Sequence, residues 1–345
     1  MIAASLAGCK KYVTDYNFPD TVPEKQWNVT TIAGNGDPIF ANGTIVNASF
    51  RAPLDIAVTD DGIIYVADAL NHRIRKIDEG EVSVLAGAAS ADTVSGNNLS
   101  ARFLIPSYLT IDNNGDLLML DVNDPRVRKV SPAGFVSTIA GNGISGFADG
   151  KANIAEFGKE CAGITVDGDG NIYVSDWRNR RIRKITPNGT VSTYAGNGQS
   201  GLVNGNAANA QFFNAGGLVI DKLGNLYVGD FNRIRKITVD GFVSTLAGKD
   251  SSGYKDGPAD DALFSSIVDL AIDDAGNIYA TDQNRIRKIT QEGVVSTIAG
   301  GAGGYKDGEG RFAQFNGPTG LAIDKYGNIY VADDHNNRIR EISSQ

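Results

Sequence analysis

Residues 163–196 read GITVDGDGNIYVSDWRNRRIRKITPNGTVSTYAG. The stretch contains four short segments rich in Ile, Val, Tyr and Thr, and Gly, Asn and Asp separate them, which is typical of strands joined by tight turns. No segment of the chain keeps the period of an amphipathic helix. We therefore expect four antiparallel strands, at about 162–167, 171–176, 181–186 and 190–195.

The same pattern recurs six times along the chain. Its last strand reads NVTTIAG, EVSVLAG, FVSTIAG, TVSTYAG, FVSTLAG and VVSTIAG, starting at Asn28, Glu81, Phe135, Thr190, Phe242 and Val294. Successive copies start 53, 54, 55, 52 and 52 residues apart. A four-stranded sheet repeated at this period is a propeller blade, and each blade buries both faces against its neighbours. The sequence predicts an all-β, six-bladed β-propeller with four antiparallel strands per blade.

The two ends of the repeat region complement each other. The repeats begin with a last strand at residues 28–33 and end after a third strand at residues 338–343. The N-terminal strand is therefore predicted to complete the last blade. This closure removes the open sheet edges that a linear array would expose.

A phenylalanine followed by strings such as GLAID at 320–324, GNIYVAD at 327–333, NRIRKI at 232–237 and VSTIAG at 136–141 resembles the NHL repeat. The resemblance covers residues 28–345, nearly the whole chain. It implies a six-bladed propeller, a fold that serves binding proteins and a few enzymes. Together with the N-terminal pattern described next, the chain resembles secreted NHL-repeat lipoproteins of Bacteroidetes.

The N-terminus carries a possible lipid attachment site. Leu6, Ala7 and Gly8 before Cys9 resemble a bacterial lipobox, in which the cysteine is lipidated. A secretory signal has about 15–30 residues and a basic start. Residues 1–9 are therefore interpreted as a truncated lipoprotein signal remnant, residues 10–27 as a flexible tether with Pro19 and Pro23, and residues 28–345 as the propeller. The expected location is the bacterial cell envelope, with membrane attachment only through the lipid. The alternative interpretation of Cys9 is a free thiol in a plain N-terminal segment.

Charge and composition restrict the partners. The formal net charge is −8 and the pI about 4.9, so the phosphate backbone of a nucleic acid should be repelled. The 42 glycines among 345 residues predict many tight turns. We expect a monomer that does not bind nucleic acid.

A recurrent arginine and a recurrent aspartate are predicted to form structural ion pairs within or between blades. The arginines are Arg75, Arg128, Arg183, Arg235, Arg287 and Arg340, and the aspartates that end the preceding strands are Asp68, Asp121, Asp176, Asp230, Asp282 and Asp333. Charges matched in this way suit partly buried pairs. The alternative is a basic ring that would bind an anionic ligand.

Cofactor and metal motifs are weak. The GxGxxG string at Gly141–Gly146 lacks a following helix, and the acidic string at Asp167–Asn171 has Ile172 where a calcium loop needs glycine. We interpret them as an inter-blade loop and a hairpin turn. The two histidines, His72 and His335, lie at different offsets, and Cys161 is expected to be a buried apolar residue. No catalytic residue, no metal site and no cofactor is predicted, although calcium stays open.

Positions that break the repeat are the candidates for a site. The start of the inner strand is Asp55, Tyr108, Gly163, Gly217, Asp269 and Gly320 in blades 1 to 6. Asp55, Tyr108 and Asp269 depart from glycine and should lie near the channel mouth, where the carboxylates would hold a cation, a sugar hydroxyl or a basic side chain. The alternative is that solvent or backbone N–H groups satisfy them.

Loop aromatic residues form the second group of candidates. Trp177 and Arg178 follow the second strand of blade 3, Phe231 follows that of blade 4, and Tyr254 and Tyr305 occupy equivalent loops before blades 5 and 6. Exposed aromatic rings suit stacking on sugars or a protein partner, or they pin their loops. We expect a propeller that binds a glycan or protein partner at its loop face. The alternatives are a lactonase-like or lyase-like enzyme with a central metal, and a pure scaffold.

Overall fold

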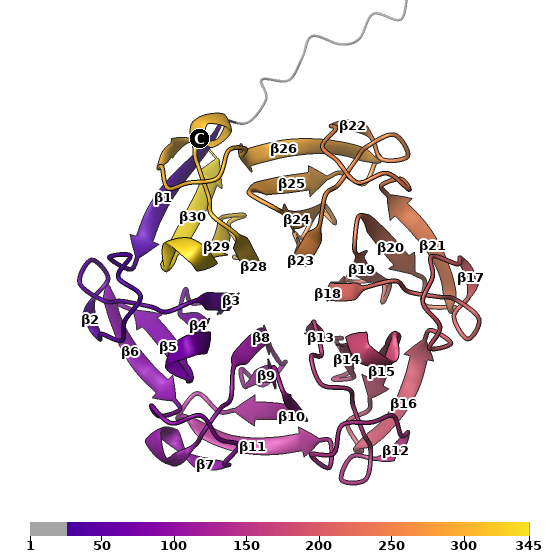
Figure 1. The fold of residues 1–345 in the computed structure, drawn as a ribbon, viewed down its shortest axis with the longest axis horizontal. Coiled ribbons are helices and arrows are strands. Elements are labelled where there is room, and N and C mark those ends of the chain that lie inside the picture. Colours follow the sequence, from indigo (N-terminus) through magenta and orange to yellow (C-terminus); the bar gives the residue numbers. More distant parts are fainter. Residues whose placement is uncertain (1–25, 345) are drawn as a thin grey trace, which may run out of the picture.

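Each copy of the repeat folds into one sheet, and the six sheets form a ring with their innermost strands at the centre (Figure 1). The computed structural model describes residues 26–344. Every blade is antiparallel. The six-bladed, all-β architecture predicted from the sequence is therefore confirmed.

The four main strands of blades 1 to 3, from the channel outward, are as follows. Blade 1 contains β3 (Pro53–Val58), β4 (Ile64–Asp68), β5 (Arg73–Asp78) and β6 (Glu81–Ala86). Blade 2 contains β8 (Pro106–Ile111), β9 (Leu117–Asp121), β10 (Asp124–Val130) and β11 (Phe135–Ala140). Blade 3 contains β13 (Ile164–Val166), β14 (Ile172–Asp176), β15 (Arg181–Ile185) and β16 (Thr190–Ala195).

Blades 4 to 6 repeat this arrangement. Blade 4 contains β18 (Ala215–Ile220), β19 (Leu226–Asp230), β20 (Arg233–Ile237) and β21 (Phe242–Ala247). Blade 5 contains β23 (Ile267–Ile272), β24 (Ile278–Asp282), β25 (Arg285–Ile289) and β26 (Val294–Gly300). Blade 6 contains β28 (Pro318–Ile323), β29 (Ile329–Asp333), β30 (Arg338–Ser344) and β1 (Trp27–Ala33).

The blade differs from the prediction in one respect, because each sheet has a fifth strand. A two-residue strand from the preceding inter-blade loop pairs with the outer edge of each blade: β2 (Gly43–Thr44), β7 (Gly96–Asn97), β12 (Gly150–Lys151), β17 (Gly205–Asn206), β22 (Gly257–Pro258) and β27 (Gly308–Glu309). Such short pairings lack the alternating pattern that marks a strand in a sequence. They cover the outer edge of every sheet.

Short 3-10 helices complete the secondary structure of the described residues. They are η1 (Ala69–Asn71), η2 (Asn98–Ser100), η3 (Trp177–Asn179), η4 (Gly310–Phe312) and η5 (Asp334–Asn336). Within residues 26–344, no helix is long and apolar enough to cross a membrane. Cys9 lies outside the described residues.

The N-terminal strand closes the ring. β1 pairs with β30 from Trp27↔Ser344 to Ala33↔Ile339, and its other edge pairs with β27. In Figure 1 the indigo β1 lies beside the yellow β30, so the two ends of the propeller share one sheet. The predicted completion of the last blade by the N-terminal strand is confirmed.

The core lies between adjacent blades rather than at the centre of the ring. Each blade interface has its own cluster of buried apolar side chains. One phenylalanine from each inter-blade loop is fully buried there: Phe50, Phe103, Phe157, Phe212, Phe264 and Phe315. Because every apolar face is covered by the next blade, the strands read as nearly continuous apolar runs.

The recurrent arginines are structural in all six blades. Arg183 is fully buried, and its guanidinium pairs with Asp176 at 2.9 Å and donates to the backbone carbonyls of Glu156 and Ala148, each at 2.9 Å. Equivalent ion pairs join Arg75–Asp68, Arg235–Asp230, Arg287–Asp282 and Arg340–Asp333. The arginine therefore ties the inter-blade loop to its own blade, and the basic-ring alternative is wrong.

Blade 2 corrects one of the predicted pairs. Arg128 contacts Asp124 at 3.3 Å, and Asp121 instead accepts the backbone N–H groups of Leu104 and Ile105. Burial raises the pKa of Asp121 to about 7. β10 begins here with an additional aspartate, Asp124, so a carboxylate closer to the arginine along the chain takes the pairing role.

Candidate functional site

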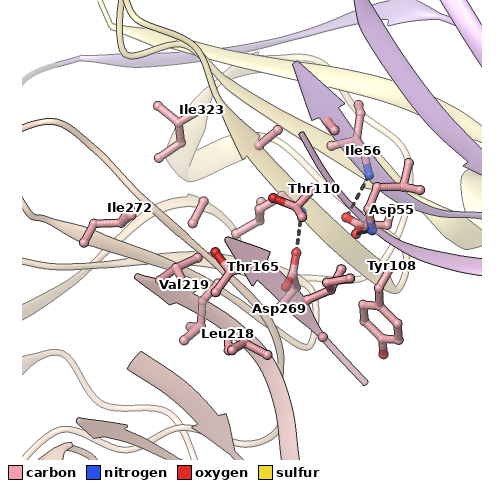
Figure 2. Close-up of a pocket in the computed structure, with 18 of the residues that line it drawn as sticks. Asp55, Ile56, Tyr108, Thr110, Thr165, Leu218, Val219, Asp269, Ile272 and Ile323 are labelled. Carbon is pink, nitrogen blue, oxygen red and sulfur yellow. Dashed lines mark hydrogen bonds between the residues drawn. The ribbon is translucent and has the colours of Figure 1, made fainter. Parts of the chain in front are cut away.

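The inner strands surround a narrow axial channel. Its cavity, about 260 Å³ in volume, is lined by residues that include Asp55, Tyr108, Gly163 and Asp269. Figure 2 shows Asp55 and Asp269 close together at one end of this cavity, with the Tyr108 ring directed away from its apolar part. The structure therefore brings the three predicted channel-mouth residues together.

The two carboxylates are capped by backbone N–H groups. Asp55 is 4% exposed and accepts N–H of Ile56 and of Leu109, both at 2.7 Å. Asp269 accepts N–H of Leu321 at 2.9 Å. Leu109 lies in the blade after that of Asp55, and Leu321 lies in the blade after that of Asp269. Each carboxylate therefore joins its inner strand to the next one, which is the alternative interpretation considered from the sequence.

The glycines of the channel ring make room for these carboxylates. A Cβ atom on Gly320 would lie 2.1 Å from Oδ1 of Asp55, and a Cβ atom on Gly217 would lie 2.2 Å from Oδ1 of Asp269. Real Cβ contacts are never this short, so an aspartate in one blade requires glycine in the blade before it. This pairing explains the glycines of blades 4 and 6, which precede the aspartates of blades 5 and 1 around the ring.

Burial raises the pKa of both channel carboxyls. The pKa of Asp269 is raised to about 7 by loss of hydration, against the lowering effect of its backbone N–H donors. The pKa of Asp55 is raised well above the usual value for the same reason, and the charge of Asp269 raises it further. Burial therefore favours the protonated form of both carboxyls.

A wider depression of about 420 Å³ lies over the start of the inner strands of blades 2 to 5. It is lined by Tyr108, Val122, Glu160, Cys161, Ala162, Trp177, Asn214, Gly216, Ser266, Ile267 and Val268. We call this depression the mouth. Tyr108 also lines the channel cavity, so its ring lies between the mouth and the channel.

Trp177 is held in a fixed position at the mouth. It begins η3, and its indole Nε1 donates a hydrogen bond to Oδ1 of Asn214 in the loop that leads into blade 4. The Arg178 guanidinium lies 4.9 Å from the indole ring centre, and its Nε pairs with Glu160 at 2.8 Å. A half-buried tryptophan fixed by a hydrogen bond presents a rigid apolar surface to a ligand.

Phe231 extends the aromatic surface over blade 4. Its ring packs against that of Phe213 with the centroids 5.5 Å apart, and Phe213 is 47% exposed. The backbone of Phe231 has φ +62°, while the equivalent turns of blades 2 and 5 have Asn123 and Gln283 at positive φ. This conformation costs an L-residue about 1–2 kcal/mol, and asparagine tolerates it best. The turn therefore places a bulky ring where asparagine would be less strained.

Tyr254 and Tyr305 lie apart from the mouth. The Tyr254 ring stacks on Arg285 at 4.1 Å, and the Tyr305 ring stacks on Arg338 at 3.9 Å. Phe40 and Phe147 stack in the same way on Arg73 and Arg181. Four of the six inter-blade loops thus place an aromatic ring over an arginine, which accounts for these tyrosines by packing.

Two residues of the mouth, and Phe213 beside it, were not singled out from the sequence. Asn214 and Phe213 are adjacent in the loop before blade 4, and Glu160 lies in the loop before blade 3. The available signal was the string Phe212-Phe213-Asn214, which places two aromatic residues where sister loops have one. Within residues 26–344, no group of three or more His, Cys, Asp and Glu side chains gathers in a way that could hold a metal ion.

Comparisons with known proteins agree with this architecture. The NHL repeat matches residues 50–77 and 315–342. Mouse Teneurin-3 is 27% identical over 368 residues; the match covers 91% of this chain but 13% of Teneurin-3, so the chain spans a small part of that relative. The fold and the repeats define a six-bladed propeller. The chain is a six-bladed propeller with NHL repeats matched at its first and last blades.

Solved structures share the fold at low identity. An auxiliary nutrient binding protein from Bacteroides thetaiotaomicron superposes with a TM-score of 0.70 at 16% identity, covering 93% of this chain and 77% of that one. Virginiamycin B lyase from Staphylococcus aureus superposes with a TM-score of 0.55 at 15% identity, covering 92% and 99%. At these identities the likeness shows the fold alone.

Proposed function

We propose that the propeller is a binding module that holds a neutral glycan at its mouth. The observation that carries the proposal is the fixed Trp177 ring beside a depression of about 420 Å³ that Tyr108 closes from below. Ligand sites are concave and largely apolar, with a few placed polar groups. Asn214 and Ser266 provide such groups, and Phe213 with Phe231 would extend the contact along a longer chain.

Charge at the mouth favours a neutral ligand over an anionic one. Glu160 is the ionisable carboxylate among the lining residues, Asp55 and Asp269 lie beneath it, and Arg178 is already paired with Glu160. A sulfated or phosphorylated ligand would meet carboxylates without a free cation. The B. thetaiotaomicron neighbour is an auxiliary nutrient binding protein, which supports a binding role. Both channel carboxylates already accept backbone N–H groups, which makes them less suited to hold the central metal of the enzyme alternative.

A glycan array with Trp177→Ala as the comparison tests the proposal. We expect the parent protein to bind neutral glycans and the variant to lose at least tenfold in affinity. Tyr254→Ala is the matched control, since it removes an aromatic ring remote from the mouth. The mouth site would be refuted if Trp177→Ala bound every glycan with parental affinity. If the parent and not the variant captured a protein, the ligand of the mouth would be a protein and not a glycan.

We further propose that Cys9 carries a lipid that tethers the propeller to the cell envelope. The lipobox-like string Leu6–Cys9, which precedes the propeller in the chain, supports this. When the gene is expressed with a complete signal, Cys9→Ala should move the protein from the membrane fraction to the soluble fraction. Unchanged partitioning of that variant would contradict the tether.

A further inference from the structure

A second cleft opens on the face of the propeller opposite the mouth. β13 starts at the mouth and ends at the hairpin turn of residues 167–170, and this turn borders a cleft of about 670 Å³ between blades 3 and 4. The cleft is lined by Val166, Asp167, Gly168, Asp169, Asn171, Tyr173, Lys184, Tyr194, Ile220, Asp221, Lys222, Leu223, Gly224 and Val239. Its volume is within the range of small-ligand sites.

Tyr194 breaks the repeat at this cleft. The equivalent residues of the other blades are Ile32, Leu85, Ile139, Leu246 and Ile298. The Tyr194 ring packs edge-on against Tyr173, with centroids 5.0 Å apart. The Tyr173 hydroxyl donates to Asp167 at 3.1 Å, whereas the Tyr194 hydroxyl forms no hydrogen bond within residues 26–344. A tyrosine in place of an aliphatic residue therefore adds one free hydroxyl to the cleft.

Lys184 contributes an ammonium group without a carboxylate partner. Its Nζ lies 5.4 Å from the Tyr173 ring centre, and none of the described carboxylates pairs with it. In blade 2 the equivalent Lys129 pairs with Asp116. Blade 3 has Asn171 in the place of Asp116, and the amide of Asn171 donates to Asp167 at 2.8 Å. Asparagine at this position also accompanies Lys236 in blade 4 and Lys288 in blade 5, so blade 2 is the exception, and the amide leaves Lys184 without a carboxylate partner.

The remaining walls supply an acceptor and an apolar surface. Asp169 is exposed, and its carboxylate accepts no hydrogen bond from the described residues. Leu223 is 79% exposed and Val239 is 69% exposed, and both border the cleft. One side of the cleft is thus apolar, while the other offers two hydrogen-bond donors and a carboxylate acceptor.

Asp167 does not make this a cation site. Its Oδ1 accepts N–H of Asp169 at 3.0 Å and of Asn171 at 2.8 Å, and its Oδ2 accepts from Asn171 and Tyr173. The same turn recurs at Asp221 and Asp324. The carboxylate is therefore occupied by the hairpin, as expected from the sequence.

We propose that this cleft binds a neutral sugar residue. A sugar ring has an apolar face of C–H groups, which would lie against Leu223 and Val239, and hydroxyl groups that donate and accept in turn. Tyr194 and Lys184 would donate to them and Asp169 would accept. A net negative cleft disfavours an anionic ligand. The site is distinct from the mouth, because it lies on the opposite face and shares no lining residue with the mouth.

Saturation-transfer NMR with glucose, galactose, N-acetylglucosamine, maltose and cellobiose tests the proposal. Tyr194→Leu introduces the residue that blade 4 has at this position, so the variant should fold. We expect at least one sugar to show a saturation-transfer signal and to shift the amide resonances of Gly224 and Val239. The same sugar should bind the Tyr194→Leu variant at least tenfold more weakly. Each sugar is tested at up to about 20 mM, which would saturate a site with a Kd of about 1 mM. Absence of binding of every sugar at that concentration would overturn the proposal.

Trp177→Ala separates this site from the mouth. The Gly224 and Val239 shifts should persist in that variant, while any shifts of Asn214 and Gly216 should disappear. A separate cleft site would be refuted if Tyr194→Leu bound the sugar with parental affinity, or if Trp177→Ala lost the Gly224 shift. Neither result would contradict the proposal for the mouth.

Discussion

Arg183 and Asp176 form an ion pair with an N–O distance of 2.9 Å, and neither side chain is exposed to solvent. The guanidinium also lies between the rings of Phe147 and Phe157, 4.9 and 5.0 Å from their centres. A buried pair broken on one side leaves the other charge without compensation. The recurrence of this arrangement around the ring makes it a fixed part of the blade.

Arg183→Ala should therefore lower the free energy of unfolding by about 3–5 kcal/mol. Asp149→Ala is the matched control: Asp149 also contacts Arg183, but its side chain is 43% exposed, so its loss should cost less than about 1 kcal/mol. Denaturant unfolding measures both. A stable Arg183→Ala variant with defective ligand binding would reverse the structural assignment.

Removal of the closing strand should destabilise the whole ring. Deleting residues 1–34 removes β1 and exposes the edges of β30 and β27, which would aggregate or melt well below the parent. Deleting residues 1–25 removes no described strand and should leave the melting temperature nearly unchanged. Thermal unfolding of both truncations decides the matter, and identical melting curves would contradict the closure.

Asp269 should make stability fall as the pH rises from about 4 to about 7. Its pKa in the folded protein is about 7, above the unfolded value of 3.8, so the folded state binds more protons in this range and the stabilisation is complete only below pH 4. Each pH unit costs at most about 1.4 kcal/mol. Asp269→Asn should flatten this part of the stability profile.

At low pH the variant should be about as stable as the parent, because the protonated carboxyl of Asp269 and an amide each offer one carbonyl oxygen to the backbone N–H group of Leu321. Asp169→Asn, at an exposed position, should leave the profile unchanged. Denaturant unfolding at half-unit pH intervals measures the slope. A parental slope in Asp269→Asn would show that other groups carry the pH dependence.

The repeat made the fold predictable, whereas the contacts between blades were hidden. Six copies of one string set the number of blades, and the position of the first copy predicted the closure. The role of Asp55 depended on Leu109, which is 54 residues away and contributes only a backbone N–H. Such a partner leaves no side-chain signal, so the sequence could not separate capping from ligand binding.

Deviations from the repeat located part of the site but could not rank its members. Trp177 and Tyr108 meet at the mouth, and both were found because sister blades have other residues there. Tyr254 was chosen on the same grounds, yet its ring stacks on Arg285. The repeat frame assigns a residue to a loop; whether the ring faces a ligand or an arginine depends on side-chain direction.

Phe231 and Phe213 provide a test in which strain and contact are separated. Both Phe231→Asn and Phe213→Ala remove the same ring contact, which is worth about 0.5–1.5 kcal/mol. Only Phe231→Asn also relieves the strain of positive φ, which is worth about 1–2 kcal/mol. We expect the free energy of unfolding of Phe231→Asn to lie within about 1 kcal/mol of the parent value and above that of Phe213→Ala by a similar amount.

Both variants should weaken glycan binding at the mouth, because the aromatic surface over blade 4 is lost. Denaturant unfolding and the glycan array measure the two effects on the same samples, and a Phe231→Asn variant that loses stability while retaining full binding would show that the ring serves packing alone.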